Sequence, residues 1–177
     1  HGALKIVMSA ENTFFQMRKN PYMDEIYSRG FMTDLSKVRR NETSQLVYHK
    51  TLNYGDCILE KRAAAAAGIN EKIFINTKGQ ISEGTVCNVF FVRKNMIYTP
   101  QLSCGLLPGI LREYIMERFQ VTETIIYPDE LMYYEECFVT NSLMGVMPVR
   151  QLGNICFPHR AKADEVREVY EKEKMSL

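Results

Sequence analysis

Two residues in the first half of the chain have side chains suited to chemistry on a carbonyl compound, one as the reacting amine and one as a supporting acid. Lys50 lies in Tyr48–Tyr54, between a polar segment and an alanine-rich stretch, so we expect it at the junction of two elements. A lysine held against apolar residues loses part of its preference for the charged form and becomes an amine able to form a Schiff base. Glu83 lies in Ile81–Thr85 beside a glycine, where a carboxylate can pair with a protonated ring nitrogen. A solvated surface lysine and a β-turn with an exposed glutamate are the alternatives.

Two loops add groups that bind anions. Gly105–Leu111 leads into a predicted helix, whose free backbone N–H groups and dipole favour phosphate at its N-terminus. Thr140–Ser142 is a polar turn between two apolar strands, and its hydroxyl and amide groups can bind the same phosphate or a substrate carboxylate. Taken singly, a plain loop-to-helix junction and a plain turn explain these two sequences equally well.

The elements that must position these residues are a mixture of strands and helices. Residues 3–8 and 13–17 are predicted to pair as a hairpin, and residues 19–46 to form a long connection with one strand at 31–35. A helix is predicted from Asn53 to Ala67, ended by Gly68. The other predicted strands are 72–76, 88–93, 96–99, 122–127, 136–140 and 146–149, and the other predicted helices are 110–119, a short one from 128, and 161–174. This order predicts an α+β, or mixed-sheet, domain.

Composition narrows the classes of partner. The 177 residues include 22 basic and 21 acidic ones, for a net charge of +1. The basic residues are scattered, so nucleic acid and membrane surfaces are not expected as partners, and a small molecule is. The five cysteines form no C-x-x-C pair, which argues against a zinc site or a disulfide framework and predicts a reducing, cytoplasmic compartment. The sequence has no apolar run long enough to cross a membrane and no signal-peptide pattern.

The motifs follow one another in an order that resembles the class IV aminotransferase family, the fold-type IV pyridoxal phosphate (PLP) enzymes. The resemblance covers about residues 38 to 152. The segments that carry it are Lys50–Tyr54, Ile81–Gly84, Asn88–Phe90, Tyr98–Pro100, Leu106–Arg112, Phe138–Ser142 and Met147–Val149. It implies the mixed α/β fold of the large C-terminal domain of these enzymes, as in D-amino acid aminotransferase.

The resemblance also implies roles for individual residues. Lys50 would form the Schiff base with PLP and move a proton between substrate and cofactor, and Glu83 would keep the pyridine nitrogen protonated. The other implied cofactor contacts are Leu107 on the ring face, the phosphate site at Gly109, Ile110, Leu111 and Ser142, and Tyr54 at the 3′-oxygen. Many members have threonine in place of Leu111, so only its backbone contact would remain. In branched-chain enzymes the lysine and the tyrosine are one residue further apart than Lys50 and Tyr54.

Within this family we predict a 4-amino-4-deoxychorismate lyase, which eliminates pyruvate to give 4-aminobenzoate for folate biosynthesis. Asn141–Val149 resembles the lyases, where the asparagine lies in the substrate pocket. Arg18 is a candidate for binding the substrate carboxylate, with an ordinary surface arginine as the alternative. Branched-chain or D-amino acid aminotransferase is the alternative reaction. A non-catalytic remnant that kept the fold for binding or assembly is the alternative of another class, and retention of both Lys50 and Glu83 argues against it.

Family members begin with a smaller N-terminal domain that supplies a phosphate-binding arginine and part of the substrate pocket. We therefore expect residues 1–37 to be the end of that domain, with the hairpin and a linker, and residues 38–177 to be the PLP-binding C-terminal domain. The piece alone is expected to be inactive or nearly so. The whole protein is expected to be a homodimer that acts on an amino acid or on aminodeoxychorismate.

Overall fold

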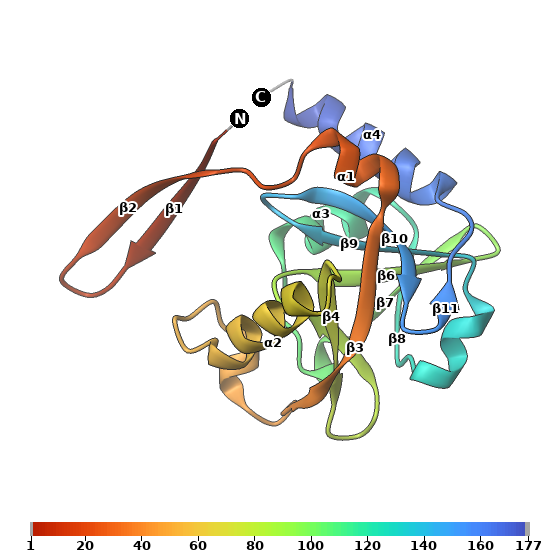
Figure 1. Cartoon of the computed structure of the whole chain (residues 1–177), viewed down its shortest axis with the longest axis horizontal. Coiled ribbons are helices and arrows are strands. Elements are labelled where there is room, and N and C mark those ends of the chain that lie inside the picture. The colour runs from red at the N-terminus through yellow and green to blue at the C-terminus, as the bar shows by residue number, and fades with distance from the viewer. Residues whose placement is uncertain (1, 176–177) are drawn as a thin grey trace.

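A nine-stranded mixed sheet is the frame of the molecule (Figure 1). The computed structural model describes residues 2–175. The strands of the sheet are β3 (Phe31–Arg40), β4 (Glu71–Asn76), β5 (Ile81–Gly84), β6 (Asn88–Arg93), β7 (Met96–Pro100), β8 (Val121–Thr124), β9 (Glu136–Asn141), β10 (Gly145–Leu152) and β11 (Ile155–Cys156). Neighbours follow the order β5-β4-β3-β10-β9-β6-β7-β8, and β11 pairs with β10. Parallel and antiparallel pairs occur together, which confirms the predicted mixed α+β class.

The two strands β6 and β9 form the middle of the core because their side chains are buried on both faces. They pair antiparallel, with Phe90 opposite Phe138, and these two rings stack 4.9 Å apart. A strand covered on both faces has a nearly continuous apolar run instead of an alternating one. The sequence Asn88–Arg93 has such a run, and the prediction of a fully buried strand there is confirmed.

Four α-helices surround the sheet: α1 (Asp24–Arg29), α2 (Gly55–Ala66), α3 (Ile110–Arg118) and α4 (Ala161–Lys174). The prediction for α2 is confirmed, since the helix stops before Gly68, whose positive φ of 70° favours glycine. Three short 3₁₀ turns complete the list: η1 (Gln45–Tyr48), η2 (Leu102–Cys104) and η3 (Pro128–Tyr133). None of the helices in residues 2–175 is long and apolar enough to cross a membrane.

The prediction of a long connection over residues 19–46 is wrong except for its one strand at 31–35, which is confirmed as the first half of β3. This stretch contains α1 and the ten-residue β3, which pairs in parallel with both β4 and β10. The alternation of apolar and polar residues that marks a strand is hard to see in β3, because two of its buried positions are polar. Thr33 donates to the carbonyl of Gln151 (2.9 Å), and Ser36 donates to the Glu60 carboxylate (2.7 Å). The predicted domain boundary at residues 37 and 38 falls inside this strand.

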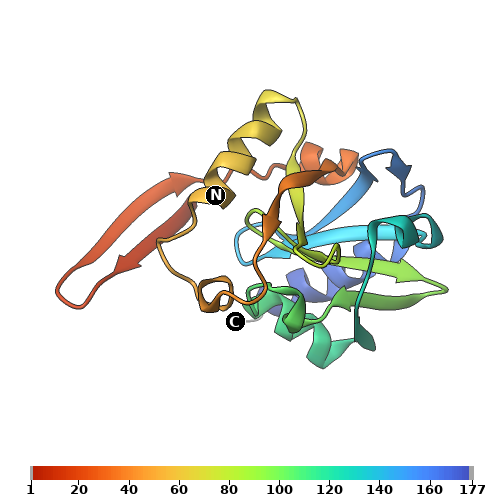
Figure 2. The ribbon, with the colours of Figure 1, turned by 90° about the horizontal axis from the view of Figure 1, so that it is seen from below.

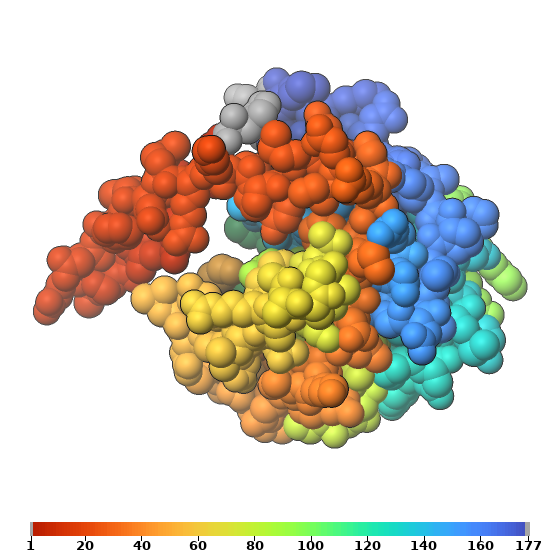
Figure 3. All heavy atoms as spheres, viewed as in Figure 1, coloured from red at the N-terminus to blue at the C-terminus, as the bar shows by residue number. Residues whose placement is uncertain are grey.

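The N-terminal hairpin stands apart from the main sheet. Strands β1 (Gly2–Met8) and β2 (Thr13–Lys19) pair antiparallel, as predicted, and form a sheet of their own. Figures 2 and 3 show it extending away from the body of the molecule. The register places large exposed apolar side chains on one of its faces, namely Leu4, Ile6, Met8, Phe15 and Met17.

Candidate active site

Lys50 lies in an irregular segment, residues 49–54, between η1 and α2. Its side chain is exposed. Its positive charge has a small effect on the pKa of Glu83, opposite to the larger effect of burial, which raises that pKa. The fold thus places the amine within electrostatic range of the carboxyl that the sequence predicted as its partner, 33 positions away.

Glu83 belongs to strand β5, and its carboxylate is buried. One carboxylate oxygen forms an ion pair with Arg40, and the other accepts a hydrogen bond from the backbone N–H of Leu107 (3.0 Å). Burial raises the pKa of Glu83, and Arg40, the Leu107 N–H and Lys50 act in the opposite direction. The alternative of an exposed glutamate in a β-turn is wrong, because Ile81–Gly84 is a buried strand.

Arg40 is a site residue that the sequence did not reveal. At the end of β3, its guanidinium binds Glu83, lies 3.5 Å from the Cys57 sulfur and packs 4.9 Å from the centre of the Phe74 ring. It thus joins the start of α2 to strand β5. Its position directly after the exposed Arg39 made it look like half of a solvated basic pair, and no local pattern distinguishes the two arginines.

The start of α3 offers unsatisfied backbone donors. Gly109 is the N-cap residue and provides no side-chain cap, so the N–H groups of Ile110 and Leu111 are available to a ligand. A Cβ at Gly109 would clash with the carboxamide of Asn88, which itself donates to the carbonyl of Leu107 (2.9 Å). Such an uncapped helix start fits a phosphate group, and Leu107 connects it directly to Glu83.

Other predicted site residues have different surroundings. Tyr54 is half-buried as the N-cap residue of α2. The Asn141 carboxamide donates to the carbonyl of Val86 (3.0 Å) and accepts from the N–H groups of Leu143 and Met144. Asn141 thus fixes the β9–β10 turn.

Ser142 and Arg18 are both exposed. Ser142 lies in the turn that Asn141 holds, so its position depends on that carboxamide. Arg18 lies on β2, where its guanidinium binds the Gln16 side chain (2.8 and 3.0 Å). Among the described residues, no contact links Arg18 to the Lys50–Glu83 pair, and its substrate role stays a prediction.

The chain is similar to known enzymes over most of its length. The family described as amino-transferase class IV matches residues 3–152, and so extends the resemblance across the hairpin. A branched-chain-amino-acid aminotransferase candidate from Thermotoga maritima is 36% identical over 90 residues, which are 48% of this chain and 33% of that protein. The chain spans well under two thirds of that relative.

Two solved structures have closely similar folds. A candidate 4-amino-4-deoxychorismate lyase from Legionella pneumophila superposes with a TM-score of 0.82 at 26% identity, covering 91% of this chain and 61% of that one. A candidate branched-chain aminotransferase from Thermotoga maritima superposes with a TM-score of 0.82 at 27% identity, covering 93% and 62%. The chain belongs to the class IV aminotransferase family, whose members are PLP-dependent enzymes.

Proposed function

We propose that Lys50 is the amine that binds PLP covalently in this protein, and that Glu83 and the start of α3 hold the ring and the phosphate. The observation that carries this proposal is the hydrogen bond between the buried Glu83 carboxylate and the N–H of Leu107, two residues before the uncapped Gly109. The effect of the Lys50 charge on the pKa of Glu83 supports a place for the amine on the same side. An amine, a buried acid and a phosphate cradle are the groups that PLP requires.

When bound, PLP supplies an aldehyde and an electron-withdrawing pyridine ring. Glu83 would hold a proton at the ring nitrogen: burial raises the pKa of this carboxyl, and Arg40 and the Leu107 N–H partly oppose that effect. The N–H groups of Ile110 and Leu111 orient the phosphate. Lys50, being exposed, is free to exchange protons with a substrate carbon once the cofactor is in place.

For the reaction we propose pyruvate elimination from 4-amino-4-deoxychorismate first. The sequence Asn141–Val149 supports it, and so does the similarity to the Legionella fold. Transamination of branched-chain amino acids is the second candidate, supported by the 36% identity with the Thermotoga relative. The two supporting folds have equal TM-scores, so the overall fold does not separate the reactions.

The reactions are separated by two parallel assays on the whole PLP-loaded protein, with Lys50→Ala as the control. One assay follows pyruvate release from aminodeoxychorismate, and the other follows amino-group transfer from branched-chain and D-amino acids to 2-oxoglutarate. Pyruvate release that Lys50→Ala abolishes is the expected result. Amino-group transfer without pyruvate would assign the aminotransferase instead. Bound PLP without either reaction would favour the non-catalytic remnant.

A further inference from the structure

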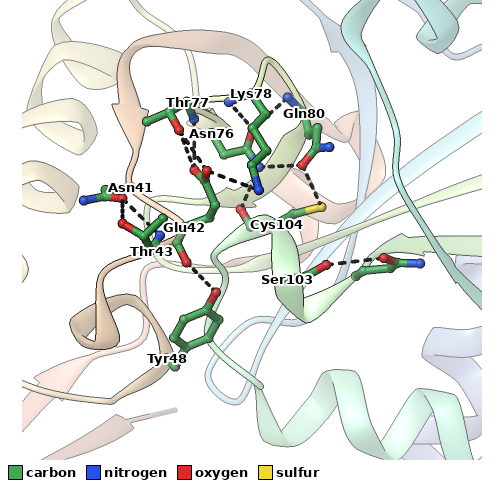
Figure 4. Close-up of polar contacts among 11 residues, drawn as sticks. Asn41, Glu42, Thr43, Tyr48, Asn76, Thr77, Lys78, Gln80, Ser103 and Cys104 are labelled. Carbon is green, nitrogen blue, oxygen red and sulfur yellow. Dashed lines mark hydrogen bonds and ion pairs between the residues drawn. The ribbon is translucent and has the colours of Figure 1, made fainter.

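One acidic residue, Glu42, contacts three segments next to the candidate site, through its backbone on two sides and through its carboxylate on the third (Figure 4). The first is the segment that carries Lys50. The Tyr48 hydroxyl at the end of η1 donates a hydrogen bond to the Glu42 backbone carbonyl (2.7 Å). Tyr48 lies two residues before Lys50, so this bond fixes the upstream end of the irregular segment 49–54.

The second segment is the turn between β4 and β5. The Glu42 carboxylate, only 4% exposed, accepts hydrogen bonds from the Thr77 hydroxyl (2.8 and 2.9 Å) and the Thr77 N–H (3.2 Å). Lys78 adds a charge contact at 3.6 Å. The Glu42 backbone N–H and the Thr77 hydroxyl hold the pKa of the Glu42 carboxyl below its usual range. Thr77 directly follows β4, and the turn leads into β5, the strand of Glu83.

The third segment is the loop that leads into α3. Gly105, with a positive φ of 84°, packs so closely on Glu42 that an added Cβ would lie 2.7 Å from the Glu42 Cα. The Asn76 carboxamide ties this loop to the β4–β5 turn by donating to Gln80 (2.7 Å) and to the Cys104 carbonyl (3.4 Å). The loop then carries Leu107, the partner of Glu83.

We infer that Glu42 is a positioning residue for Lys50: it holds the amine-bearing segment in register with the segments that carry the acid and the phosphate cradle. The inference rests on the proposed function of Lys50. It follows because residues 49–54 have no regular structure of their own. Their upstream end is tied to the protein through Tyr48 and Glu42, so a looser Glu42 leaves Lys50 in the wrong place more often.

The test uses four single variants of the whole protein and one double variant. Thr77→Val removes the hydroxyl that binds the Glu42 carboxylate, and Thr77→Ser restores it. Tyr48→Phe removes the hydroxyl that donates to the Glu42 backbone carbonyl, next to the segment of Lys50. Thr122→Val, at an exposed position of β8, is the matched control for a threonine-to-valine change.

The first measurement is amide hydrogen exchange of residues 44–54 without cofactor. Thr77→Val and Tyr48→Phe are each expected to speed exchange there about tenfold, the scale of one lost hydrogen bond to a charged or buried group. The exchange rate of residues 88–93 is expected to stay unchanged in every variant. In Thr77→Ser and Thr122→Val, the exchange rate of residues 44–54 is also expected to stay unchanged. Because the two bonds act in series through Glu42, the double variant Thr77→Val/Tyr48→Phe should exchange little faster than either single one.

The second measurement is the rate at which PLP becomes attached to Lys50, trapped by borohydride and quantified by peptide mass. This rate should fall about tenfold in Thr77→Val and recover in Thr77→Ser. The inference would be overturned if Thr77→Val left the exchange rate of residues 44–54 unchanged. It would also be overturned if the double variant showed the product of the two single-variant effects on that rate. If the parent protein attaches no PLP at Lys50, the proposed function fails instead, while the exchange data still decide the role of Glu42.

Discussion

At the scale of single residues, the site depends on two buried carboxylates, Glu83 and Glu42, whose partners come from distant segments. The sequence predicted Lys50 and Glu83 because each lies in a short motif with a recognisable neighbour. Arg40 and Glu42 have no such motif. Their roles arise from contacts made across 43 and 35 positions of the chain, and single-sequence reasoning has no access to contacts of that kind.

The Arg40–Glu83 pair yields a prediction about stability. Arg40→Met leaves the buried Glu83 carboxylate without its cation, which costs about 3–5 kcal/mol at neutral pH. Its pKa, already raised by burial, then rises further. Between the unfolded pKa of about 4.3 and the folded pKa, the folded state binds more protons than the unfolded state, so stability falls as pH rises. The parent follows the same trend with its lower folded pKa, so the loss of stability in Arg40→Met should grow with pH between the folded pKa of Glu83 in the parent and the higher one in the variant, as urea titrations at a series of pH values would measure.

Arg39→Met is the matched control for that change. Arg39 is the neighbouring arginine and is exposed, so its loss should shift the free energy of unfolding by only about 0.5 kcal/mol or less. A deficit in Arg40→Met that stays constant across this pH range would contradict the account of Glu83 as an ionised carboxylate held by Arg40.

At the scale of elements, α2 is held to the sheet by an ion pair with one buried partner. Lys61 on the helix reaches Glu71 at the start of β4 (2.9 Å), and the Glu71 side chain is 1% exposed. Thr85 also donates to Glu71 through its backbone N–H (3.2 Å). The alanine run predicted α2 but not where it docks, because docking depends on a charge pair that helical periodicity does not show.

Lys61→Met should destabilise the protein by about 3 kcal/mol, since it leaves the Glu71 carboxylate buried without a cation. Lys174→Met is the control: its pair with Glu171 (3.3 Å) joins two side chains that are 55% and 39% exposed, and such pairs contribute about 0–1 kcal/mol. Urea denaturation of both variants measures the difference. Equal losses in the two would refute the anchoring role of Lys61.

At the scale of the whole molecule, the mixed class, the hairpin, α2, α4 and the buried β6–β9 centre were predictable, because each has a local pattern of apolar or helix-forming residues. The position of β3 in the middle of the sheet was not predictable. Only residues 31–35 were predicted as a strand, and residues 36–40 read as a polar connection. The parallel pairing of β3 with β4 and β10 depends on strands far away in the chain. Strand order in a mixed sheet is a property of the whole chain.

The hairpin is expected to be the least stable part of the molecule. A two-stranded sheet is marginal in water without a packing partner, and β1–β2 has its apolar face exposed. Amide hydrogens of residues 2–19 should therefore exchange at least about a hundredfold faster than those of β6 and β9. Equal protection in the hairpin and in the central strands would show that another surface covers this face in solution.

The attachment point of PLP tests the central claim most directly. The whole protein is incubated with PLP, reduced with borohydride, digested and mapped by mass spectrometry, beside a Lys50→Arg variant. The account predicts one labelled peptide, containing Lys50, and no label in the variant. Label on another lysine, or label that persists in Lys50→Arg, would contradict it.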